Sequence, residues 1–288
     1  RIYHAVDPYF ITAVGAASSM ALCWLASVLT AHYSFVDRLW SILPPLYALH
    51  YLLHAAYIHG SLWANPRLAL VVLLIVAWGI RLTFNYWRKG GYRWGEQDYR
   101  WSVVRASMPR WAFQPFNLLF IAIYQLWLLS ALTAPVYICW RAGFAHWCAM
   151  DIAATLLFVA ALLGETVADE QQWRFHQRKQ SFEAPAKRYR RKSNDPVAVV
   201  DADVRNGFLT GGLWRYSRHP NFFCEQAIWL AVYMFGTAAT GAWLRWDGAA
   251  VVTLILLFQG STTLTEQITA SKYPAYAAYQ RTTSRLMP

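Results

Sequence analysis

Residues 111–140 read WAFQPFNLLFIAIYQLWLLSALTAPVYICW, and this run of 30 residues contains no charged side chain. A bilayer core of about 30 Å is crossed by roughly 20 apolar residues in a helix. The run is therefore long enough for a tilted membrane span, or for a span with an interfacial turn ahead of Pro115. This stretch favours an all-α transmembrane fold over a soluble one.

The composition of the 288 residues points the same way. Hydrophobic residues make up 57% and charged residues 14%, and the mean hydropathy is +0.23. A soluble domain carries about 25% charged residues, so the composition argues against a soluble enzyme. The apolar content also excludes a disordered chain. The net charge of +11 fits nucleic acid, anionic lipid or an anionic cofactor, and only the positions of the charges separate these classes.

Further apolar runs on both sides bring the prediction to about seven spans. Their ranges in chain order are 9–31, 34–58, 66–87, 111–140, 147–168, 221–244 and 247–266. Pro44 and Pro45 should kink or break the second span, because proline lacks the amide hydrogen that a helix needs. The first run is too long for the apolar part of a cleaved signal peptide and lacks its basic start, so we predict a true span.

The positions of Lys and Arg predict the orientation. Loop 88–112 holds six, loop 169–219 holds eleven and the tail after Glu266 holds three, together 20 of the 26 basic residues. Short cytosolic loops collect Lys and Arg, and with seven spans these segments fall on one face. The carboxyl terminus is therefore predicted to be cytosolic and the amino terminus to lie on the opposite side. The basic residues of that opposite side are Arg1, Arg67, Arg141 and Arg245.

We expect one membrane-embedded domain over residues 1–288, with a lipid-substrate half at 1–140 and a cofactor-binding half at 141–288. The fifth span should continue as a helix beyond the bilayer, because one helical face then carries four polar residues. These are Glu165, Asp169, Gln172 and His176. The basic run 187–192 that follows is typical of a solvated loop or of a contact with lipid headgroups.

Charged residues inside the predicted spans are candidates for function, because a charge in hydrocarbon is costly. They are Asp37, Arg81, Glu165, Glu225 and Glu266. Mutual pairing, for example of Asp37 or Glu165 with Arg81, would satisfy them without any catalysis. They lie at the span ends that face the basic loops, so a site built from them would open to the cytosol.

The densest polar cluster is GGLWRYSRHPNFFCE at residues 211–225. Its polar members include Arg215, Arg218, His219, Asn221 and Glu225. Two arginines and a histidine just before Pro220, a typical first residue of a helix, suit an anion such as phosphate. Asn221 and Glu225 are four residues apart and face the same way on that helix. The alternative is a clamp for lipid headgroups at the membrane boundary.

The carboxyl-terminal tail adds a second group of aromatic and basic residues. Tyr276 with Tyr279, and Arg281 with Arg285, are spaced as on one helix and could flank an adenine or a phosphate. The alternative is an ordinary interfacial anchor of Tyr and Arg, which the tail by itself favours.

Metal and disulfide chemistry is not indicated. The cysteines have no CxxC spacing and are expected to be packing residues; they are Cys23, Cys139, Cys148 and Cys224. His50 and His54 form a single HxxxH pair, which offers too few ligands for a metal centre. The longest loop, of about 50 residues, is too short for a Rossmann domain, so a nucleotide would bind among the membrane helices.

These motifs resemble the steroid 5-alpha-reductase superfamily, in its 3-oxo-5-alpha-steroid 4-dehydrogenase-like branch. The matching segments are GLWRYSRHPNFFCE at 212–225, GEQDYR at 95–100, the Glu165 and Asp169 pair, and KYPAYAAYQRTTSRLMP at 272–288. The resemblance covers most of the chain. It implies a multi-span reductase that takes hydride from NADPH and reduces a carbon–carbon double bond in a steroid, sterol or polyprenoid lipid.

The resemblance also implies roles for individual residues. NADPH would be held in a cytosol-facing cavity by Asp169, Arg174, Arg215, Arg218, His219, Asn221, Glu225, Tyr276 and Arg281. Candidates for the acid that polarises or protonates the substrate are Asp37, Tyr86 and Tyr99, near a lipid-accessible cavity between the first four spans. Phe222 and Cys224 stand where the family often has Tyr and Gly, and the residues that hold a steroid have no clear counterpart here.

Two alternatives stay open. Methyltransferases of isoprenylcysteine and phospholipids carry a similar Arg-His-Pro segment but bind S-adenosylmethionine, which has no phosphate, so the surplus of arginine favours NADPH. The fold could also persist in a non-catalytic subunit of a larger membrane complex. The expected surroundings are a lipid bilayer and a hydrophobic lipid substrate, without nucleic acid. In a eukaryote the endoplasmic reticulum membrane is expected, with another organelle or a bacterial inner membrane as alternatives.

Overall fold

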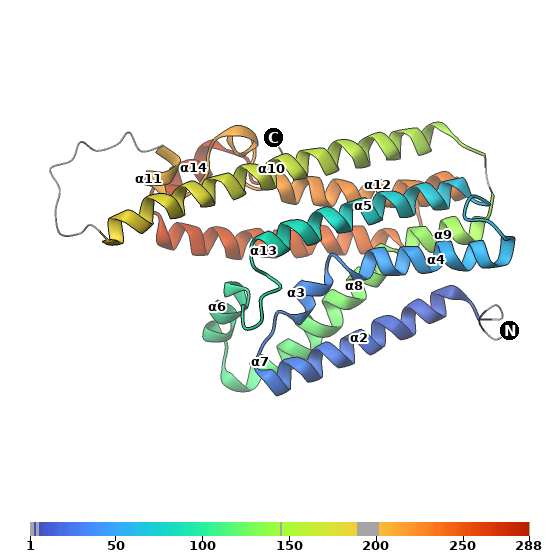
Figure 1. The fold of residues 1–288 in the computed structure, drawn as a ribbon, viewed down its shortest axis with the longest axis horizontal. Helices are drawn as coiled ribbons and strands as arrows, with labels where there is room; N and C mark the ends of the chain where they lie inside the picture. The colour runs from blue at the N-terminus through green and yellow to red at the C-terminus, as the bar shows by residue number, and fades with distance from the viewer. Residues whose placement is uncertain (1–2, 4–5, 145, 189–201, 288) are drawn as a thin grey trace. The chain divides into compact units, whose positions relative to one another are not determined.

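The structure is a computed structural model that describes residue 3 and residues 6–144, 146–188 and 202–287. These residues form helices and no strand, as predicted (Figure 1). The helices of the first part are α2 (Pro8–Thr30), α3 (Phe35–Leu39), α4 (Leu43–His59), α5 (Pro66–Arg88), α6 (Tyr99–Ser107), α7 (Arg110–Phe116), the π-helix η1 (Asn117–Tyr124), α8 (Gln125–Leu132) and α9 (Ala134–Ala142). Those that follow are α10 (Ala149–Arg188), α11 (Ala202–Asn206), the 3₁₀ turn η2 (Gly212–Arg215), α12 (Pro220–Thr240), α13 (Gly248–Lys272) and α14 (Tyr276–Thr282).

Six helices in the described part of the chain are long and apolar enough to cross a membrane, which confirms a multi-span helical protein. They cover Pro8–Thr30, Pro66–Arg88, Arg110–Ala142, Ala149–Phe182, Pro220–Thr240 and Gly248–Lys272. The predicted span 34–58 is not among them. It divides into α3 and the 17-residue α4, because Pro44 and Pro45 can stand only in the first turn of a helix. At about 1.5 Å per residue α4 is somewhat shorter than a bilayer core.

Local signals fix where several helices begin. Asp7 caps α2 by accepting a hydrogen bond from the Tyr9 amide at 2.8 Å, and Pro8 occupies the first turn. Asn65 caps α5 in the same way through the Leu68 amide at 3.1 Å, ahead of Pro66. These Asp-Pro and Asn-Pro pairs can be recognised in the sequence, and they fix the residue at which each helix begins.

The chain divides into two compact units. Unit 1 comprises residues 1–158 and 229–254, and unit 2 comprises residues 159–228 and 255–288. Helices α10, α12 and α13 each contribute to both units. These units are defined by packing, so the division into a substrate half and a cofactor half at residue 140 stays a prediction.

In unit 1, buried ion pairs and hydrogen bonds connect neighbouring segments at the end where α5 begins. Asn65 donates to the carbonyl oxygens of Cys139 and Gly143, both at 2.9 Å, and so ties the start of α5 to the end of α9. Arg67 donates from Nε to Asp151 Oδ1 at 2.6 Å, and both side chains are buried. Two of the arginines predicted for the non-cytosolic side, Arg67 and Arg245, are therefore neutralised, the latter by Asp247 at 2.8 Å. Arg1 lies outside the described residues.

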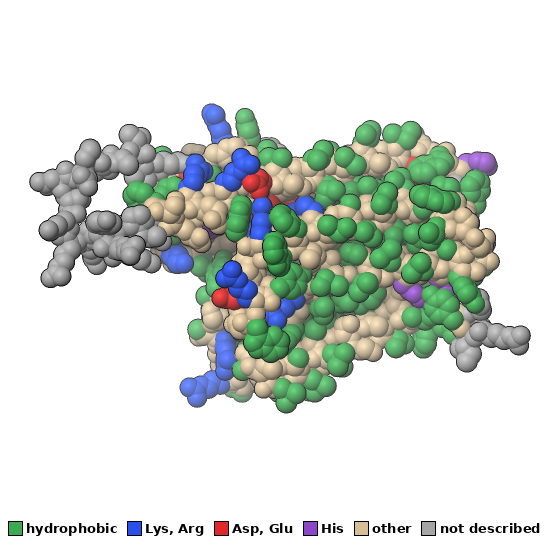
Figure 2. Space-filling model, viewed as in Figure 1, with side chains coloured by type: hydrophobic (Ala, Val, Ile, Leu, Met, Phe, Trp, Pro, Cys, Tyr) green, Lys and Arg blue, Asp and Glu red, His purple; other side chains and the backbone are tan. Residues whose placement is uncertain are grey.

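The end of unit 1 that holds loop 88–112 is basic. Arg38 stabilises it by donating to the carbonyl oxygens of Gly91 at 3.2 Å and Arg93 at 3.0 Å. Highly exposed tryptophans lie in the same stretch, with Trp94 86% and Trp111 80% exposed, as in the aromatic belt of a membrane boundary. Apolar side chains spread over the visible surface of the helices, as lipid contact requires (Figure 2).

In unit 2, α10 runs unbroken to Arg188, which confirms that the fifth span continues beyond its apolar part. The buried aromatic and aliphatic side chains that hold the unit together form two small clusters. One contains Phe175, Leu209 and Trp214, and the other contains Phe208, Tyr276 and Tyr279. The side chains of the basic run 187–192 lie outside the described part of the chain.

The cysteine prediction holds for Cys23 and Cys139, which are buried, and Cys224 is partly buried. It is wrong for Cys148, which is exposed just before α10. There the backbone amide of Cys148 donates to Asp151 at 2.9 Å, so the residue serves the helix start rather than the core.

Candidate functional site

The centre of unit 2 is the carboxylate of Glu266 on α13, which is 3% exposed. Arg218 donates to it from Nε at 2.7 Å and from Nη2 at 3.1 Å. The Gln280 amide donates at 2.9 Å, and His219 Nε2 lies 3.0 Å away. Because a carboxylate can only accept, His219 Nε2 is the donor in this contact. Glu266 thus joins the 211–225 cluster to the carboxyl-terminal tail.

Arg218 uses its remaining donors on the same tail. Its Nη1 donates to the carbonyl oxygen of Gln280 at 3.0 Å and to that of Thr283. The backbone of this segment is also bonded to the tail. The Arg218 amide donates to the Ser284 carbonyl at 2.9 Å, and the His219 amide donates to the Arg285 carbonyl at 3.1 Å. Four of the five N–H groups of this guanidinium are therefore held by protein acceptors. The geometry gives Arg218 an internal structural role, and its predicted phosphate contact stays a prediction.

Helices α10 and α12 run antiparallel in unit 2 and bring the predicted polar stripe together. A Cβ on Gly164 would stand 2.9 Å from Cys224 Sγ, so the glycine permits a close approach of the two helices. Five residues further along α10, Asp169 accepts a hydrogen bond from Asn221 Nδ2 at 3.4 Å. Asp169 and Glu225 are both buried. The structure therefore unites Asp169, Asn221 and Glu225 along one pair of helices.

Arg215 and Arg281 are exposed and are carried by two segments that touch. The hydroxyl of Tyr279 donates to the carbonyl oxygen of Trp214. Trp214 directly precedes Arg215, and Tyr279 lies two residues before Arg281. Tyr279 and Trp214 are both buried, so this contact fixes η2 against α14. No described residue forms an ion pair with either arginine. Two guanidiniums without acidic partners on adjoining segments favour an anion.

Tyr276 and Arg174 lie in contrasting surroundings. Tyr276 is buried, and burial together with the negative charge of Glu266 raises the pKa of its phenol to about 12. The hydroxyl therefore stays protonated at neutral pH and can donate a hydrogen bond. Arg174 is 74% exposed and pairs with Glu170 at 2.8 Å one turn earlier on α10. This pair satisfies Arg174 at the surface, so its predicted cofactor contact has the least support.

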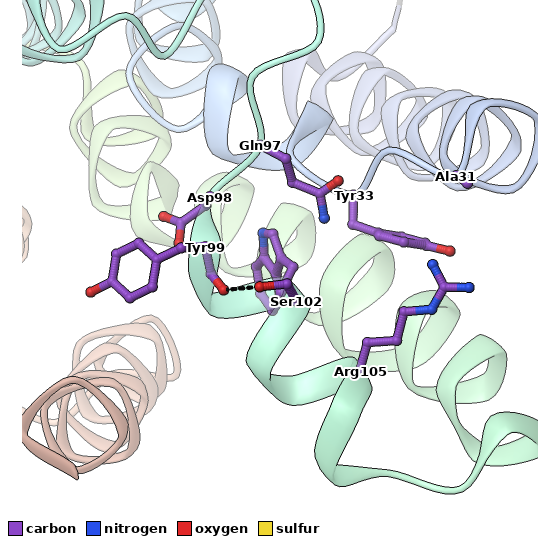
Figure 3. Close-up of a pocket in the computed structure, with 8 residues that line it drawn as sticks. Ala31, Tyr33, Gln97, Asp98, Tyr99, Ser102 and Arg105 are labelled. Carbon is purple, nitrogen blue, oxygen red and sulfur yellow. Dashed lines mark hydrogen bonds between the residues drawn. The ribbon is translucent and has the colours of Figure 1, made fainter. Parts of the chain in front are cut away.

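The predicted acids lie in unit 1, around α3. Asp37 accepts a hydrogen bond from Trp101 Nε1 at 2.8 Å. Burial raises the pKa of this carboxyl above its ordinary value of 3.8, and outweighs the positive charge of Arg100 and the Trp101 bond, which lower it. Tyr86 packs on Gly91, where a Cβ would stand 2.3 Å from the ring. Tyr99 is 55% exposed and lines a pocket of about 260 Å³ (Figure 3).

Several residues of these sites were not predicted from the sequence. Gln280 completes the Glu266 network, and Gln171 accepts a hydrogen bond from the Leu213 amide at 2.9 Å, which positions η2. Trp101 is the partner of Asp37. Single amides and indoles at irregular spacing carry no motif, so only their position in the fold reveals them. Among the described residues no group of three His, Cys, Asp or Glu side chains could hold a metal ion.

Comparison with known proteins shows which family the chain belongs to. A family model described as a protein of unknown function (DUF1295) matches residues 23–283. The chain belongs to this family. It is also 38% identical over 291 residues to a Schizosaccharomyces pombe protein described as uncharacterized, an alignment that covers 99% of this chain and 81% of that protein. No solved structure matches the chain significantly. Every candidate residue from Asp37 to Arg281 lies inside the matched region.

Proposed function

We propose that this chain is a membrane-embedded, NADPH-dependent reductase of a carbon–carbon double bond in a steroid, sterol or other isoprenoid lipid. The proposal rests on the resemblance of its motifs to the steroid 5-alpha-reductase superfamily. In a eukaryotic cell we propose the endoplasmic reticulum membrane as its location. The membrane setting suits such a substrate, because a lipid can reach the protein from the bilayer without crossing water.

The observation that supports the cofactor best is the pair of exposed arginines, Arg215 and Arg281, on segments joined by the Tyr279 to Trp214 hydrogen bond. NADPH carries a pyrophosphate and a 2′-phosphate, and charge-assisted bonds from guanidinium to phosphate are among the stronger hydrogen bonds in proteins. S-adenosylmethionine has no phosphate, so these arginines favour NADPH over the methyltransferase cofactor. Arg218 is left in its structural role with Glu266.

The buried polar residues of unit 2 would serve the uncharged parts of the cofactor. Asp169 with Asn221, and Glu225 one turn further along α12, offer acceptors and an amide for ribose hydroxyls and the nicotinamide carboxamide. Tyr276 adds a protonated hydroxyl. These side chains fit the polar groups of NADPH. When bound, NADPH would supply the hydride.

The proton would come from Asp37. Its raised pKa lets the carboxyl hold a proton at a pH where an ordinary aspartate has lost it. Trp101 fixes the carboxyl by donating to one of its oxygens, Oδ2, at 2.8 Å. Tyr86 and Tyr99 stay as further candidates for polarising a substrate carbonyl.

Thermal unfolding of the purified full chain with each cofactor tests the proposal. We expect NADPH to stabilise the protein more than NADH, and S-adenosylmethionine to have no effect; a ligand at 100 times its Kd stabilises by about 2.7 kcal/mol. The double variant Arg215→Gln, Arg281→Gln should lose at least roughly tenfold in NADPH affinity. Arg205→Gln, an exposed arginine on α11, is the matched control and should bind normally.

Stabilisation by S-adenosylmethionine alone would replace the reductase with a methyltransferase. No response to either cofactor would favour a non-catalytic subunit. The reaction itself is tested by incubating the protein with NADPH and a lipid extract and searching by mass spectrometry for a lipid that gains two hydrogens. Asp37→Asn should abolish that gain while leaving NADPH binding unchanged.

A further inference from the structure

A pocket of about 260 Å³ lies in unit 1, where α2 ends and α6 begins (Figure 3). Its walls are Ala31, Tyr33, Gln97, Asp98, Tyr99, Trp101, Ser102 and Arg105. The volume is far larger than the about 15 Å³ that one water molecule needs. Figure 3 shows the side chains of Gln97, Tyr33 and Arg105 facing a shared space. The pocket therefore has room for a small polar group and side chains that could bind one.

The charge of this pocket is positive. Asp98 is its only acidic wall residue, and Arg100 neutralises it through two hydrogen bonds of 3.0 and 2.8 Å. Arg105 has no acidic partner among the described residues. Its guanidinium instead lies 5.8 Å from the ring centroid of Tyr33 and 5.6 Å from that of Phe113, and these rings hold it at the pocket. Within the described part of the chain, the positive charge of Arg105 therefore has no counter-charge.

The pocket also contains an unused amide. No described residue forms a hydrogen bond with the side chain of Gln97, which is half-buried in the wall. By contrast, the hydroxyl of Ser102 donates to the Tyr99 carbonyl at 2.7 Å and is already satisfied. An amide and a guanidinium that face one space, neither paired with a carboxylate, form a binding site suited to phosphate.

The pocket lies at the end of an apolar helix, where the headgroup layer of a bilayer is expected. Ala31 follows the last residue of the apolar helix α2, and the highly exposed Trp94 and Trp111 stand on either side of α6 in the sequence. Tryptophans of this kind mark the membrane–water boundary. On α2 itself Leu25 is 47% and Leu29 is 83% exposed, which leaves apolar surface for acyl chains just below the pocket.

We propose that this pocket binds the headgroup of an anionic membrane phospholipid, with its phosphate against Arg105 and Gln97 and its acyl chains on the surface of α2. The site is separate from the residues proposed for the cofactor, although Tyr99 and Trp101 in its wall also belong to the proposed acid site, and its test does not use reductase activity. A bound lipid there stabilises the connection between α2, α3 and α6, on which Asp37 and Trp101 stand.

The test uses the full chain purified in a maltoside detergent, which contains no phosphate. Binding of dioleoylphosphatidylglycerol is titrated by native mass spectrometry, beside dioleoylglycerol, which has the same acyl chains without phosphate, and sodium phosphate, which has no chains. We expect the phospholipid to bind at least tenfold more tightly than either. Arg105→Gln should weaken it about tenfold, whereas Arg110→Gln, a matched loss of an exposed charge at the same end of unit 1, should change it less than twofold.

A second variant keeps the charge and fills the space. Ser102→Phe should also weaken phospholipid binding about tenfold, so the proposal stays testable if Arg105→Gln folds poorly. Equal losses in Arg105→Gln and Arg110→Gln would reduce the effect to general surface charge and overturn the proposal. Equal binding of dioleoylglycerol, or equally tight binding of sodium phosphate, would overturn it too, in favour of an acyl-chain groove or a free-anion site respectively.

Discussion

Replacing Glu266 with alanine removes the acceptor of four hydrogen bonds, two from Arg218 and one each from His219 and Gln280. Arg218 is only 8% exposed, so its guanidinium would stay buried with two backbone carbonyls as its remaining acceptors. Removing one partner of a buried ion pair costs about 3–5 kcal/mol, because the other charge is left uncompensated. We expect the free energy of unfolding to fall by about that amount.

The assay is denaturant unfolding of the full chain in detergent micelles, followed by tryptophan fluorescence, with limited proteolysis of the carboxyl-terminal tail as a second readout. The tail should become accessible, because Glu266 accepts a hydrogen bond from Gln280 in the tail and also holds Arg218, which itself donates to tail carbonyls. Glu266→Gln preserves the shape but not the charge and should lose roughly 1.5–3 kcal/mol. Glu170→Ala is the matched control, since its pair with Arg174 is exposed and worth about 0–1 kcal/mol.

A result in which Glu266→Ala destabilises no more than Glu170→Ala would refute this reasoning. It would mean that the Arg218 network does not hold the tail. Arg218 would then be available to a ligand, as the sequence had indicated. The measurement therefore separates a structural arginine from a phosphate-binding one without requiring the cofactor.

Two further predictions concern charged groups of unit 1. The pKa of Asp37 is raised above 3.8, so the folded state binds this proton more tightly than the unfolded state does. The contribution of Asp37 to stability should therefore be greatest below pH 3.8 and be lost as the pH rises through the raised pKa; the difference in thermal unfolding between the wild type and Asp37→Asn, measured at a series of pH values, should follow that course. Arg67 and Asp151 form a buried ion pair, so Arg67→Met or Asp151→Leu alone should lower the free energy of unfolding by about 3–5 kcal/mol. The double variant should recover most of that loss, because neither charge is then left alone. Additive losses in denaturant unfolding would contradict the pairing.

Much of the fold could be predicted from the sequence. The long charge-free runs became the apolar helices, because a backbone in hydrocarbon must satisfy its own hydrogen bonds and a charged side chain there is costly. The break ahead of α4 was also predictable, since Pro44 and Pro45 act through local geometry. The continuation of α10 followed from a periodic polar stripe. The predicted span 34–58 is divided into α3 and α4 in the structure, and the 17-residue α4 is shorter than the six long apolar helices.

The candidate site was predicted only in part. The sequence placed Arg218, His219, Asn221 and Glu225 in one cluster, and the structure keeps them on neighbouring turns. It did not indicate that Arg218 would bind Glu266, 48 residues away, instead of remaining open to a ligand. The same holds for Asp37, whose partner is the indole of Trp101 and not Arg81 as one alternative had it.

The sequence by itself determined that the protein lies in a membrane, because the composition is apolar and a charge in lipid is costly. It also determined the helices, through local backbone chemistry, and the distribution of basic residues among the loops. The tertiary structure decided which charged side chains form ion pairs with one another. Arg67 meets Asp151 across 84 residues, and Arg218 meets Glu266, whereas Arg105, Arg215 and Arg281 have no acidic partner among the residues that the structure describes. Pairing of this kind depends on contacts between helices far apart in the chain, and no local pattern of residues encodes it.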